Sequence, residues 1–476
     1  MAASTSFFSK KIKLLYLLQI SEYDIAFFER WIKENPNLEK WWTSPTKQSL
    51  VWTLKAFTIF VLAIVFSPLV TFSERKKKLI IPYQLAVLSV RPLQGFFESI
   101  FIWRAKRKLH LNPKLIKIGI VGSYGKTTTK EYLSAVLSQR FNVFKTPENV
   151  NTLVGVARHI IKRLVKEHNI FIAEMGAYHW GDISAFRRLG ELNFGILTGI
   201  GEAHMERFSS MQNIIRAKFE LVKDTPGYSI TPILNSDDSY IRDSFLDFIK
   251  PERVTWYGIH NHASRIFDAR SIQVLPDRIR FDVWKDNTLY LQIEVPVLGR
   301  HQVAPILASV TLGHLLGMTQ EEIKQGLLQI RALPRRLYLT QSSAGISIID
   351  DTYNISLASL KAALEFIGEG YPNSRKILVS AGLLEQGQQV KETNTKAGEM
   401  MGKVTDLILI PHTSTIDYIA DGLRRSGREV TWYNPTQKTR YQGGVIFESA
   451  DLLDEQLEHI LRSGDVVIFF PYDLPD

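Results

Sequence analysis

The sequence predicts an α/β protein in which two α/β units follow an α-helical, membrane-associated region. Three observations support this prediction. The 17 residues of Ala56–Phe72 carry no charge and are mostly apolar. Beyond Lys117, short β-rich apolar runs alternate with helical segments, which is typical of a largely parallel sheet covered by helices. A second alternating series begins near Arg336, so we expect three regions, at 1–113, 114–335 and 336–476.

The composition indicates a multidomain globular protein and excludes the chemistry of cysteine. A length of 476 residues suggests about three domains, and 45% hydrophobic with 22% charged residues is enough to bury a full core. The chain has no cysteine, which excludes disulfides, zinc sites built on thiolates and cysteine nucleophiles.

The net charge of +10 is confined to the first quarter of the chain. Residues 1–117 hold 19 Lys and Arg against 7 Asp and Glu, whereas the remainder holds 39 against 41. Because the main body has no excess of cations, it lacks the broad basic surface that phosphate backbones require. We therefore expect no nucleic-acid partner.

The first quarter is expected to attach to a membrane. From Leu50 to Phe72, 23 residues are interrupted only by Lys55, a length that roughly spans a hydrocarbon core of about 30 Å. A second and weaker stretch, Leu79–Trp103, is bracketed by basic runs at 75–78 and 104–108. Five of the nine tryptophans lie in this quarter, and tryptophan favours the membrane boundary.

The alternative for this quarter is a buried helical hairpin of a soluble domain. The topology also stays open, because both stretches can span, only the first can span, or the second can be interfacial or re-entrant. The predicted location is the cell membrane, with lipid as a partner and the remainder of the chain facing the cytoplasm.

Apolar runs and helical periods place the elements of the main body. The first unit is expected to hold strands at 116–121, 170–173 and 195–200, and helices at 127–139 and 210–223. Residues 254–298 are strand-rich without intervening helices, which indicates an antiparallel patch. The second unit is expected to hold strands at 346–349, 376–380, 406–410 and 466–470, and helices near 356–367, 391–403 and 450–462.

A glycine-rich turn between a predicted strand and a predicted helix is the strongest chemical signal. The run from Gly122 to Thr129, GSYGKTTT, matches most of a phosphate-binding loop, in which backbone N–H groups at a helix N-terminus cradle phosphate oxygens. In such a loop, Lys126 reaches the β- and γ-phosphates and the Thr127 hydroxyl binds Mg²⁺. The strict pattern has glycine where this chain has Ile120. The alternative is an ordinary glycine-rich turn before a helix.

Polar residues follow three other predicted strands. Glu174 ends the run FIAE, His204 follows GILTGI, and Asp350 and Asp351 end ISIID. A carboxylate or imidazole at the carboxyl edge of a parallel sheet can bind a divalent cation, although each is also common as a structural residue. Adjacent carboxylates on a strand point to opposite faces, so at most one of the two aspartates should face a given ligand.

Several stretches, in order along the chain, resemble the Mur ligase family, which joins amino acids or peptides to a carboxylate with ATP. They are GSYGKTTTKEYL (122–133), TPENVNTLVGV (146–156), AEMGAYHWGDI (173–183), TGIGEAHMERFSSMQNIIRAKFEL (198–221), LGRHQV (298–303) and DDTYNISLASLKAAL (350–364). The resemblance implies a central P-loop ATPase domain followed by a Rossmann-like C-terminal domain.

The resemblance also implies a role for each matching residue. The ATP-binding residues would be Gly122, Ser123, Gly125, Lys126, Thr127, Thr128, Arg336, Asp351 and Asn354. The ligands of two Mg²⁺ ions would include Thr127, Glu174 and His204. The catalytic residues would be Lys126, His204 and Lys218, and Lys218 would be carbamylated to give an extra carboxylate near the metal. As a bare residue, Lys218 is instead a charge on a helix surface. Asn151 and Thr152 would approach the acceptor substrate.

The chain departs from the family pattern at several positions. A segment whose second asparagine contacts adenine in the family is GRHQVAPILA here, which places Pro305 at that position. The C-terminal motifs are altered to AGLLEQG (381–387) and FFPYDLPD (469–476), and Asn394 stands where a histidine is common. The family's small N-terminal domain for the UDP-sugar has no counterpart, because the membrane-like region precedes the glycine-rich turn directly.

The predicted function is an ATP-dependent ligase that forms an amide bond through an acyl-phosphate, in peptidoglycan precursor or cell-wall synthesis. Its partners would be ATP, a peptide or amino-sugar-peptide acceptor, and an amino acid or dipeptide amine. One alternative is a poly-amino-acid or folate-type ligase of the same superfamily, against which the EMGA and DDTYN stretches argue. Another is a membrane-bound ATP-binding scaffold that has lost ligase activity, which the altered motifs suggest.

Overall fold

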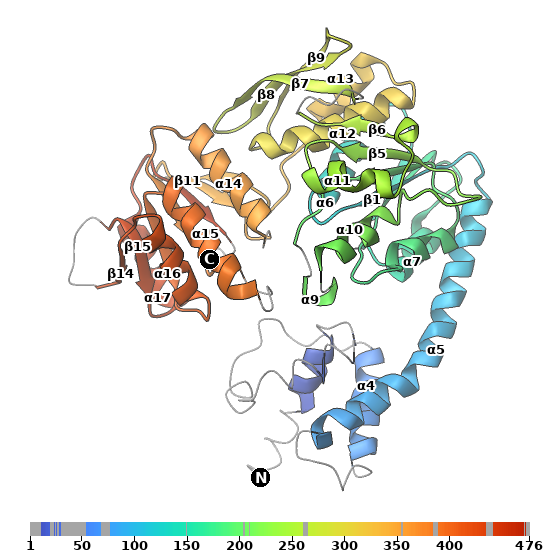
Figure 1. Cartoon of the computed structure of the whole chain (residues 1–476), viewed down its shortest axis with the longest axis horizontal. Coiled ribbons are helices and arrows are strands. Elements are labelled where there is room, and N and C mark those ends of the chain that lie inside the picture. Colours follow the sequence, from blue (N-terminus) through green and yellow to red (C-terminus); the bar gives the residue numbers. More distant parts are fainter. Residues whose placement is uncertain are drawn as a thin grey trace. The chain divides into compact units, whose positions relative to one another are not determined.

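The chain divides into two compact units, Met1–Arg104 and Ala105–Asp476 (Figure 1). The structure is a computed structural model. It describes residues 11–19, 23, 25, 28–29, 54–67, 77–148, 150–202, 205–208, 210–259, 265–353, 356–383, 389–434, 441–470 and 472.

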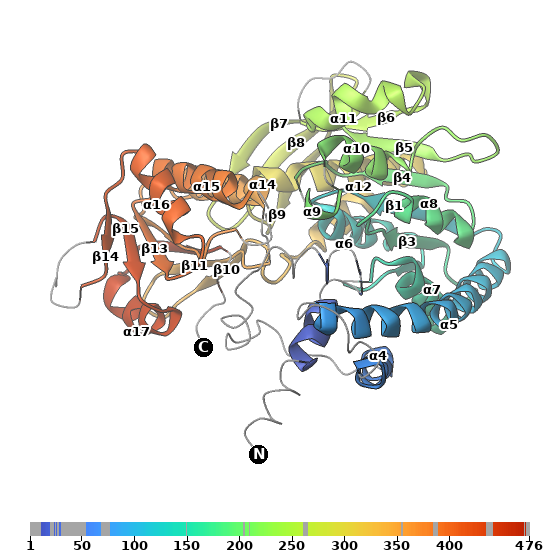
Figure 2. The same ribbon diagram turned by 60° about the horizontal axis from the view of Figure 1, so that its bottom comes forward.

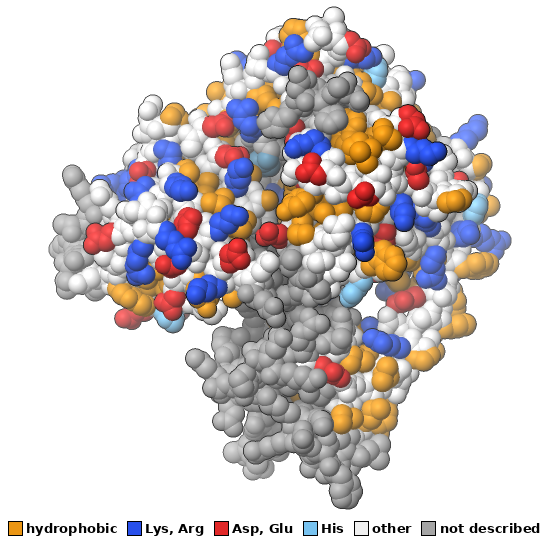
Figure 3. All heavy atoms as spheres, in the orientation of Figure 1, with side chains coloured by type: hydrophobic (Ala, Val, Ile, Leu, Met, Phe, Trp, Pro, Cys, Tyr) orange, Lys and Arg blue, Asp and Glu red, His pale blue; other side chains and the backbone are white. Residues whose placement is uncertain are grey.

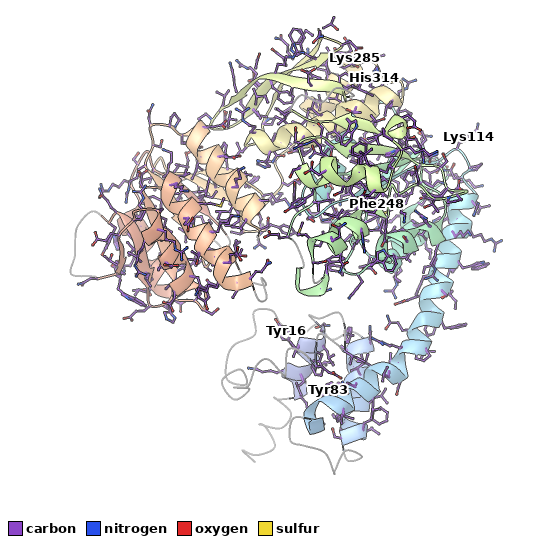
Figure 4. The ribbon with its side chains drawn as sticks, in the orientation of Figure 1. Tyr16, Tyr83, Lys114, Phe248, Lys285 and His314 are labelled. Atoms are coloured by element: carbon purple, nitrogen blue, oxygen red, sulfur yellow. The ribbon has the colours of Figure 1, made fainter. Side chains whose placement is uncertain are left out.

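The first unit is helical in its described part. It contains α4 (Leu54–Phe66) and most of α5 (Lys77–His110), a helix that continues into the second unit. Ile59 and Ala63 of α4 and Tyr83 of α5 belong to one cluster of fully buried side chains. The hydroxyl of Tyr83, labelled in Figure 4, donates a hydrogen bond of 2.7 Å to the carbonyl of Lys11.

The structure describes one helix in each of the two apolar stretches. Within Leu50–Phe72, the described helix α4 has 13 residues, and residues 50–53 and 68–72 lie outside the described part of the chain. Among the described residues, the one helix long and apolar enough to cross a membrane is Ile81–His110 of α5. Several of its large apolar side chains are exposed, among them Phe96 with 62% and Trp103 with 59% of the surface accessible. Figure 3 shows hydrophobic side chains along the visible face of this helix.

A nine-stranded sheet forms the first part of the second unit, with strand order β2-β3-β1-β4-β5-β6-β7-β8-β9. The strands are β1 (Ile116–Val121), β2 (Val143–Lys145), β3 (Ile170–Glu174), β4 (Phe194–Leu197), β5 (Thr231–Asn235), β6 (Thr255–Tyr257), β7 (Arg265–Val274), β8 (Ile279–Lys285) and β9 (Thr288–Val295). Neighbouring strands from β2 to β7 pair in parallel, and β7, β8 and β9 pair antiparallel. The predicted antiparallel patch is therefore confirmed for β7–β9.

Helices cover this sheet and supply the rest of its core. They are α6 (Lys126–Leu137), α7 (Leu153–Arg163), α8 (Asp182–Ala185), α9 (Met205–Phe208), α10 (Met211–Phe219), α11 (Ser239–Ser244), α12 (Val303–Leu315) and α13 (Gln320–Leu328), with short 3₁₀ turns at Phe186–Leu189, Phe245–Asp247, Pro251–Arg253 and Arg300–Gln302. Leu133 of α6 and Ile306 of α12 are fully buried in the same apolar cluster as Ile118 of β1. At the far end of α12, His314 Nε2 lies 3.0 Å from Lys285 Nζ of β8 (Figure 4).

A seven-stranded sheet forms the second part, with strand order β10-β11-β16-β12-β13-β15-β14. The strands are β10 (Tyr338–Gln341), β11 (Ser347–Asp350), β12 (Lys376–Val379), β13 (Leu407–Pro411), β14 (Val430–Trp432), β15 (Gly443–Phe447) and β16 (Val466–Phe469), and the helices are α14 (Leu357–Gly370), α15 (Val390–Val404), α16 (Ile416–Arg425) and α17 (Ala450–Ile460). All described pairs are parallel except β10 with β11.

Helices cover both faces of this second sheet. Figure 2 shows α14, α15 and α16 on one face and α17 on the other. The packing of β12 supports this arrangement. Leu378 packs in the same apolar cluster as residues of α14, α15 and α16, whereas its neighbours Ile377 and Val379 pack with residues of α17. Successive residues of a strand point to opposite faces, so a strand buried on both faces is apolar throughout. The mixed α/β fold with parallel sheets is as predicted.

Candidate active site

The glycine-rich turn lies between β1 and α6, as predicted. Gly125 has a φ of +76°, a left-handed conformation that glycine adopts readily. A Cβ on Gly122 would lie 2.1 Å from Thr198 Oγ1, so a larger residue does not fit there. Ile120 is fully buried in β1, and the turn begins only after Val121. The glycine of the strict pattern is therefore unnecessary, because that position is still inside the strand.

Contacts with the loop after β4 hold the turn in place. The amide of Ser123 donates to the carbonyl of Gly199 at 2.7 Å, and the Ser123 hydroxyl donates to the carbonyl of Gly201 at 3.1 Å. The hydroxyl of Tyr124 donates to Asp238 Oδ2, which also accepts the amide of Ile200 at 2.8 Å. Sequence reasoning assigned no role to Tyr124 or Asp238, because nothing near Tyr124 in the sequence indicates a carboxylate 114 residues away.

Lys126, Thr127 and Glu174 converge where β1 and β3 end. Lys126 Nζ donates to the carbonyl of Gly122 at 2.7 Å, which folds the side chain back over the turn. The Thr127 hydroxyl donates to Glu174 Oε2 at 3.0 Å. Desolvation lowers the pKa of Lys126, the charge of Glu174 opposes this shift, and the charge of Arg336 adds to it. Thr128, the next residue of α6, is half-buried.

Lys130 is a part of this site that sequence reasoning missed. Its side chain is fully buried, and its Nζ lies 3.1 Å from Glu174 Oε2 and 3.4 Å from the carbonyl of Pro147. Lys130 follows Lys126 by four residues, so the two share one face of α6. This four-residue spacing could have indicated from the sequence that Lys130 lies on the same side of the helix as Lys126.

Lys218 lies on α10 and is buried, with 3% of its surface exposed. The interpretation of Lys218 as a helix-surface charge is therefore wrong. Burial lowers the pKa of Lys218 to about 7, with a further lowering from Lys126, while Asp182 and Glu220 oppose the shift. Its Nζ lies 5.8 Å from the centre of the Phe208 ring, and no carboxylate among the described residues forms an ion pair with it. A large share of this amine is neutral near pH 7.

The loop at 146–152 lies beside the strand that ends in Glu174. The Thr146 hydroxyl accepts the amide of Glu174 at 3.1 Å. The carbonyl of Asn151 accepts the amide of Gly176 at 2.7 Å. Thr152 is the N-cap of α7, where its hydroxyl accepts the amide of Gly155. Asn151 is half-buried and Thr152 is exposed, so this loop is accessible next to Glu174.

Arg336 joins the segment between the two sheets to the turn. Its Nη2 lies 3.4 Å from Thr127 Oγ1, and its guanidinium stacks 4.1 Å from the ring centre of Tyr353. The flanking residues Arg335 and Leu337 have positive φ values of 62° and 48°, which are strained for residues other than glycine. The buried Asp351 accepts the amide of Leu337 at 3.0 Å. The structure therefore brings Arg336 to the turn and uses one oxygen of Asp351 to hold this segment.

Two of the departures from the family pattern have structural roles. Asn394 is fully buried, and its side chain accepts the amide of Leu383 at 2.8 Å and donates to the carbonyls of Leu383 and Val390 at 2.9 Å. Pro305 is buried in the first turn of α12, where a missing N–H costs no helical hydrogen bond. Gln302 accepts the hydroxyl of Tyr132 at 2.8 Å.

Two predicted site residues, the metal ligand His204 and the nucleotide contact Asn354, lie outside the described residues. Among the residues that the structure does describe, no group of three or more His, Asp or Glu side chains could hold a metal ion.

Comparisons with known proteins match the central part of the chain to a family model. Residues 120–313 match the Mur ligase middle domain, and the turn, Glu174 and Lys218 all lie within this match. The central part of the chain is therefore a Mur ligase middle domain. The chain is 30% identical over 286 residues to the UDP-N-acetylmuramoyl-tripeptide–D-alanyl-D-alanine ligase of Escherichia coli (strain K12), a match that covers 59% of this chain and 61% of that protein. The protein of the same name from Bacillus subtilis (strain 168) is 29% identical over 355 residues, which cover 74% and 72%.

Solved Mur ligase structures have the same fold as this chain. The MurF ligase of Thermotoga maritima, solved in complex with ADP, superposes with a TM-score of 0.66 at 23% identity, covering 78% of this chain and 80% of that one. A MurF structure from Acinetobacter baumannii gives a TM-score of 0.64 at 23% identity, with 78% and 77% covered. The chain thus spans about three fifths of the E. coli relative's length and about three quarters of the others.

Proposed function

We propose that this protein is an ATP-dependent enzyme that forms an amide bond through an acyl-phosphate. The observation that carries the proposal is the convergence of Lys126, Thr127 and Glu174 at the carboxyl edge of the nine-stranded sheet, inside the Mur ligase middle domain. The similar proteins are named as UDP-N-acetylmuramoyl-tripeptide–D-alanyl-D-alanine ligases. We therefore propose an acceptor of that class, and peptidoglycan precursor synthesis as the pathway.

The chain's first task is to bind the triphosphate of ATP. The N-terminus of α6 has no side-chain cap, so its first N–H groups can bind phosphate oxygens. Lys126 is the first residue of this helix, and Arg336 adds positive charge next to Thr127. In the proposed reaction, a carboxylate oxygen of the acceptor attacks the γ-phosphorus and ADP leaves. The positive groups stabilise the charge that moves onto the bridging oxygen, an effect typically worth several kcal/mol.

The residues at Glu174 fit one Mg²⁺ ion. Thr127 Oγ1 and Glu174 Oε2 are oxygen donors 3.0 Å apart, and Mg²⁺ prefers oxygen ligands from one or two protein groups together with phosphates and water. A bound ion would supply Lewis-acid neutralisation of phosphate charge. His204 remains the proposed ligand of a second ion.

Lys218 is proposed to carry a carbamate. Its neutral amine would attack CO₂, form an N–C bond and release one proton, which leaves an anionic carbamate. Burial supports this chemistry, because a pKa of about 7 makes roughly half of the amine nucleophilic at pH 7. The positive charge of Lys126, which lies close enough to lower the pKa of Lys218, would then stabilise the anion.

The second half of the reaction joins the acceptor to an amine. The amine attacks the acyl carbon of the acyl-phosphate, inorganic phosphate leaves, and the excess proton of the amine passes to solvent or to a base. Asn151 and Thr152 are the proposed acceptor contacts, because their loop is accessible and hydrogen-bonded beside Glu174. Asp351 and Asn354 are the proposed nucleotide contacts of the C-terminal region. The domain boundaries that we propose lie between residues 113 and 114 and between residues 335 and 336.

The membrane is the proposed location, with the catalytic part in the cytoplasm, where ATP is available. The support is the exposed apolar surface of α5 between Leu85 and Trp103, together with the basic residues of its last turn. That last turn belongs to the catalytic unit, because Leu109 is buried and Lys108 donates to the carbonyl of Ile161 at 2.8 Å. Attachment of α5 would therefore tether the catalytic unit to the membrane.

The test of this proposal is substrate-dependent turnover. Full-length protein in detergent should release ADP and phosphate only when a peptidoglycan-precursor acceptor and an amine are both present, and mass spectrometry should detect the new amide. ADP release with folate or poly-amino-acid acceptors alone would favour the related ligase class. ADP binding without turnover on any acceptor would favour a scaffold that has lost activity.

A further inference from the structure

Lys130 places a second buried charge directly on the proposed metal ligand. Its ammonium is fully buried and has two close oxygen partners, Glu174 Oε2 at 3.1 Å and the carbonyl of Pro147 at 3.4 Å. A second carboxylate, Glu131, lies farther away at 3.8 Å and also forms an ion pair with Lys145. A buried ammonium is tolerated only when it is paired, so Glu174 is the main counter-ion of Lys130.

The same oxygen of Glu174 also accepts the Thr127 hydroxyl. Glu174 Oε2 therefore already has two partners, the Thr127 hydroxyl and the positively charged Lys130. Two more cations lie nearby, because Arg336 Nη2 is 3.4 Å from Thr127 Oγ1 and the charges of Glu174 and Arg336 both act on Lys126. Apart from the more distant Glu131, Glu174 is the carboxylate that these described residues offer against three positive side chains.

We propose that Lys130 is a positioning residue that neutralises and orients Glu174, so that a divalent cation binds at Thr127 and Glu174 only together with nucleotide phosphates. The proposal rests on the proposed function for the existence of a nucleotide site. It goes beyond that function, because it assigns a role to Lys130 and a condition for cation binding.

The physical reason is the local balance of charge. A divalent cation that approaches without nucleotide meets a carboxylate already compensated by Lys130, together with repulsion from Lys126 and Arg336. A nucleotide brings several negative charges, which offset Lys126 and Arg336 and supply oxygen ligands to the cation. Lys130 can keep its bond to Glu174 in both states, because its second partner, the carbonyl of Pro147, belongs to the backbone.

The competing explanation is that Lys130 is a structural ion pair with no influence on cations. Both explanations predict that Lys130→Met weakens the fold, because the buried Glu174 would then lose its direct ion pair. Only our proposal predicts that cations bind more readily after the substitution, since the freed carboxylate needs a positive partner.

The experiment measures cation binding rather than ligation. Free Mn²⁺ is followed by electron paramagnetic resonance in titrations of the full-length protein in detergent, with and without ADP. The melting temperature is measured in parallel with millimolar MgCl₂ alone. The variants are Lys130→Met and, as a matched control, Lys324→Met at an exposed position of α13.

We expect the unmodified protein and Lys324→Met to bind Mn²⁺ only when ADP is present. Lys130→Met should bind Mn²⁺ without ADP at least about tenfold more tightly than the unmodified protein, because one nearby unit charge has been removed, and Mg²⁺ alone should raise its melting temperature. Tight Mn²⁺ binding by the unmodified protein without ADP would overturn the proposal even if Lys130→Met failed to fold. An unchanged cation response of a folded Lys130→Met would also overturn it. Failure to bind ADP would count instead against the nucleotide site of the proposed function.

Discussion

Replacing Lys218 with methionine should stabilise the protein while abolishing ligation. The folded protein holds the pKa of this lysine at about 7, against an ordinary value of 10.5. Between these two pH values the unfolded chain binds more protons than the folded one, so the folded state gains stability as pH rises. At 1.36 kcal/mol per pKa unit, the buried lysine lowers the free energy of unfolding by up to about 4 kcal/mol at pH 7 and by less than about 1 kcal/mol at pH 10.

Methionine removes this penalty and keeps an unbranched side chain of similar length in the cavity. The assay is denaturant unfolding of the unmodified protein and Lys218→Met in CO₂-free buffer at a series of pH values, with Lys223→Met at an exposed position as the control. The gain in stability of Lys218→Met should shrink as pH rises from 7 to 10, and Lys223→Met should show no such trend. A pH-independent loss of stability in Lys218→Met would refute the assignment of a buried, largely neutral lysine.

Three further outcomes are expected. Lys126→Ala should lower ATP turnover by at least about a hundredfold in a coupled ADP assay, because a preorganised charge at the phosphates is lost; turnover near that of the unmodified protein would contradict the phosphate-loop assignment. Gly122→Ala should weaken ADP binding in calorimetry, since its Cβ would lie 2.1 Å from Thr198 Oγ1, whereas unchanged affinity would mean that the turn can rearrange. Carbonate washing should leave the full-length chain in the membrane fraction and detergent should release it, and recovery in the soluble fraction would favour the buried-hairpin alternative.

The glycine-rich turn and Glu174 could be predicted from sequence because their signals are local. A β-rich run, a turn with two glycines and a helix follow one another within about twenty residues, and the structure places β1, the turn and α6 there. The strand that ends in Glu174 is likewise an uninterrupted apolar run, as expected for a strand buried on both faces.

Other elements could not be predicted because their sequences lack the hydrophobic pattern that is typical of a helix or a strand. Helix α12 is apolar on every side because it is buried almost throughout, so it has no amphipathic pattern. Strand β15 begins with two glycines, which are rare in strands, yet both are fully buried there. In the first quarter, apolar length alone favoured Leu50–Phe72, although the described helix within it ends at Phe66.

The surroundings of the two buried lysines depend on contacts between distant segments. Phe208, Asp182 and Glu220 surround Lys218, and only the fold shows that α10 turns its lysine inward toward them. Lys130 pairs with Glu174, which lies 44 residues away along the chain. Helical spacing from Lys126 placed Lys130 on the right face of α6, but spacing alone does not distinguish a buried ion pair from a solvated charge.

The transfer of oxygen from the acceptor to phosphate is the most direct test of the proposed reaction. An acceptor whose carboxylate is labelled with ¹⁸O is incubated with ATP, the amine and the full-length protein, and the released inorganic phosphate is analysed by mass spectrometry. An acyl-phosphate pathway predicts one ¹⁸O atom in each phosphate, because the attacking carboxylate oxygen leaves with the phosphoryl group. Amide formation with unlabelled phosphate would contradict the acyl-phosphate pathway that we propose.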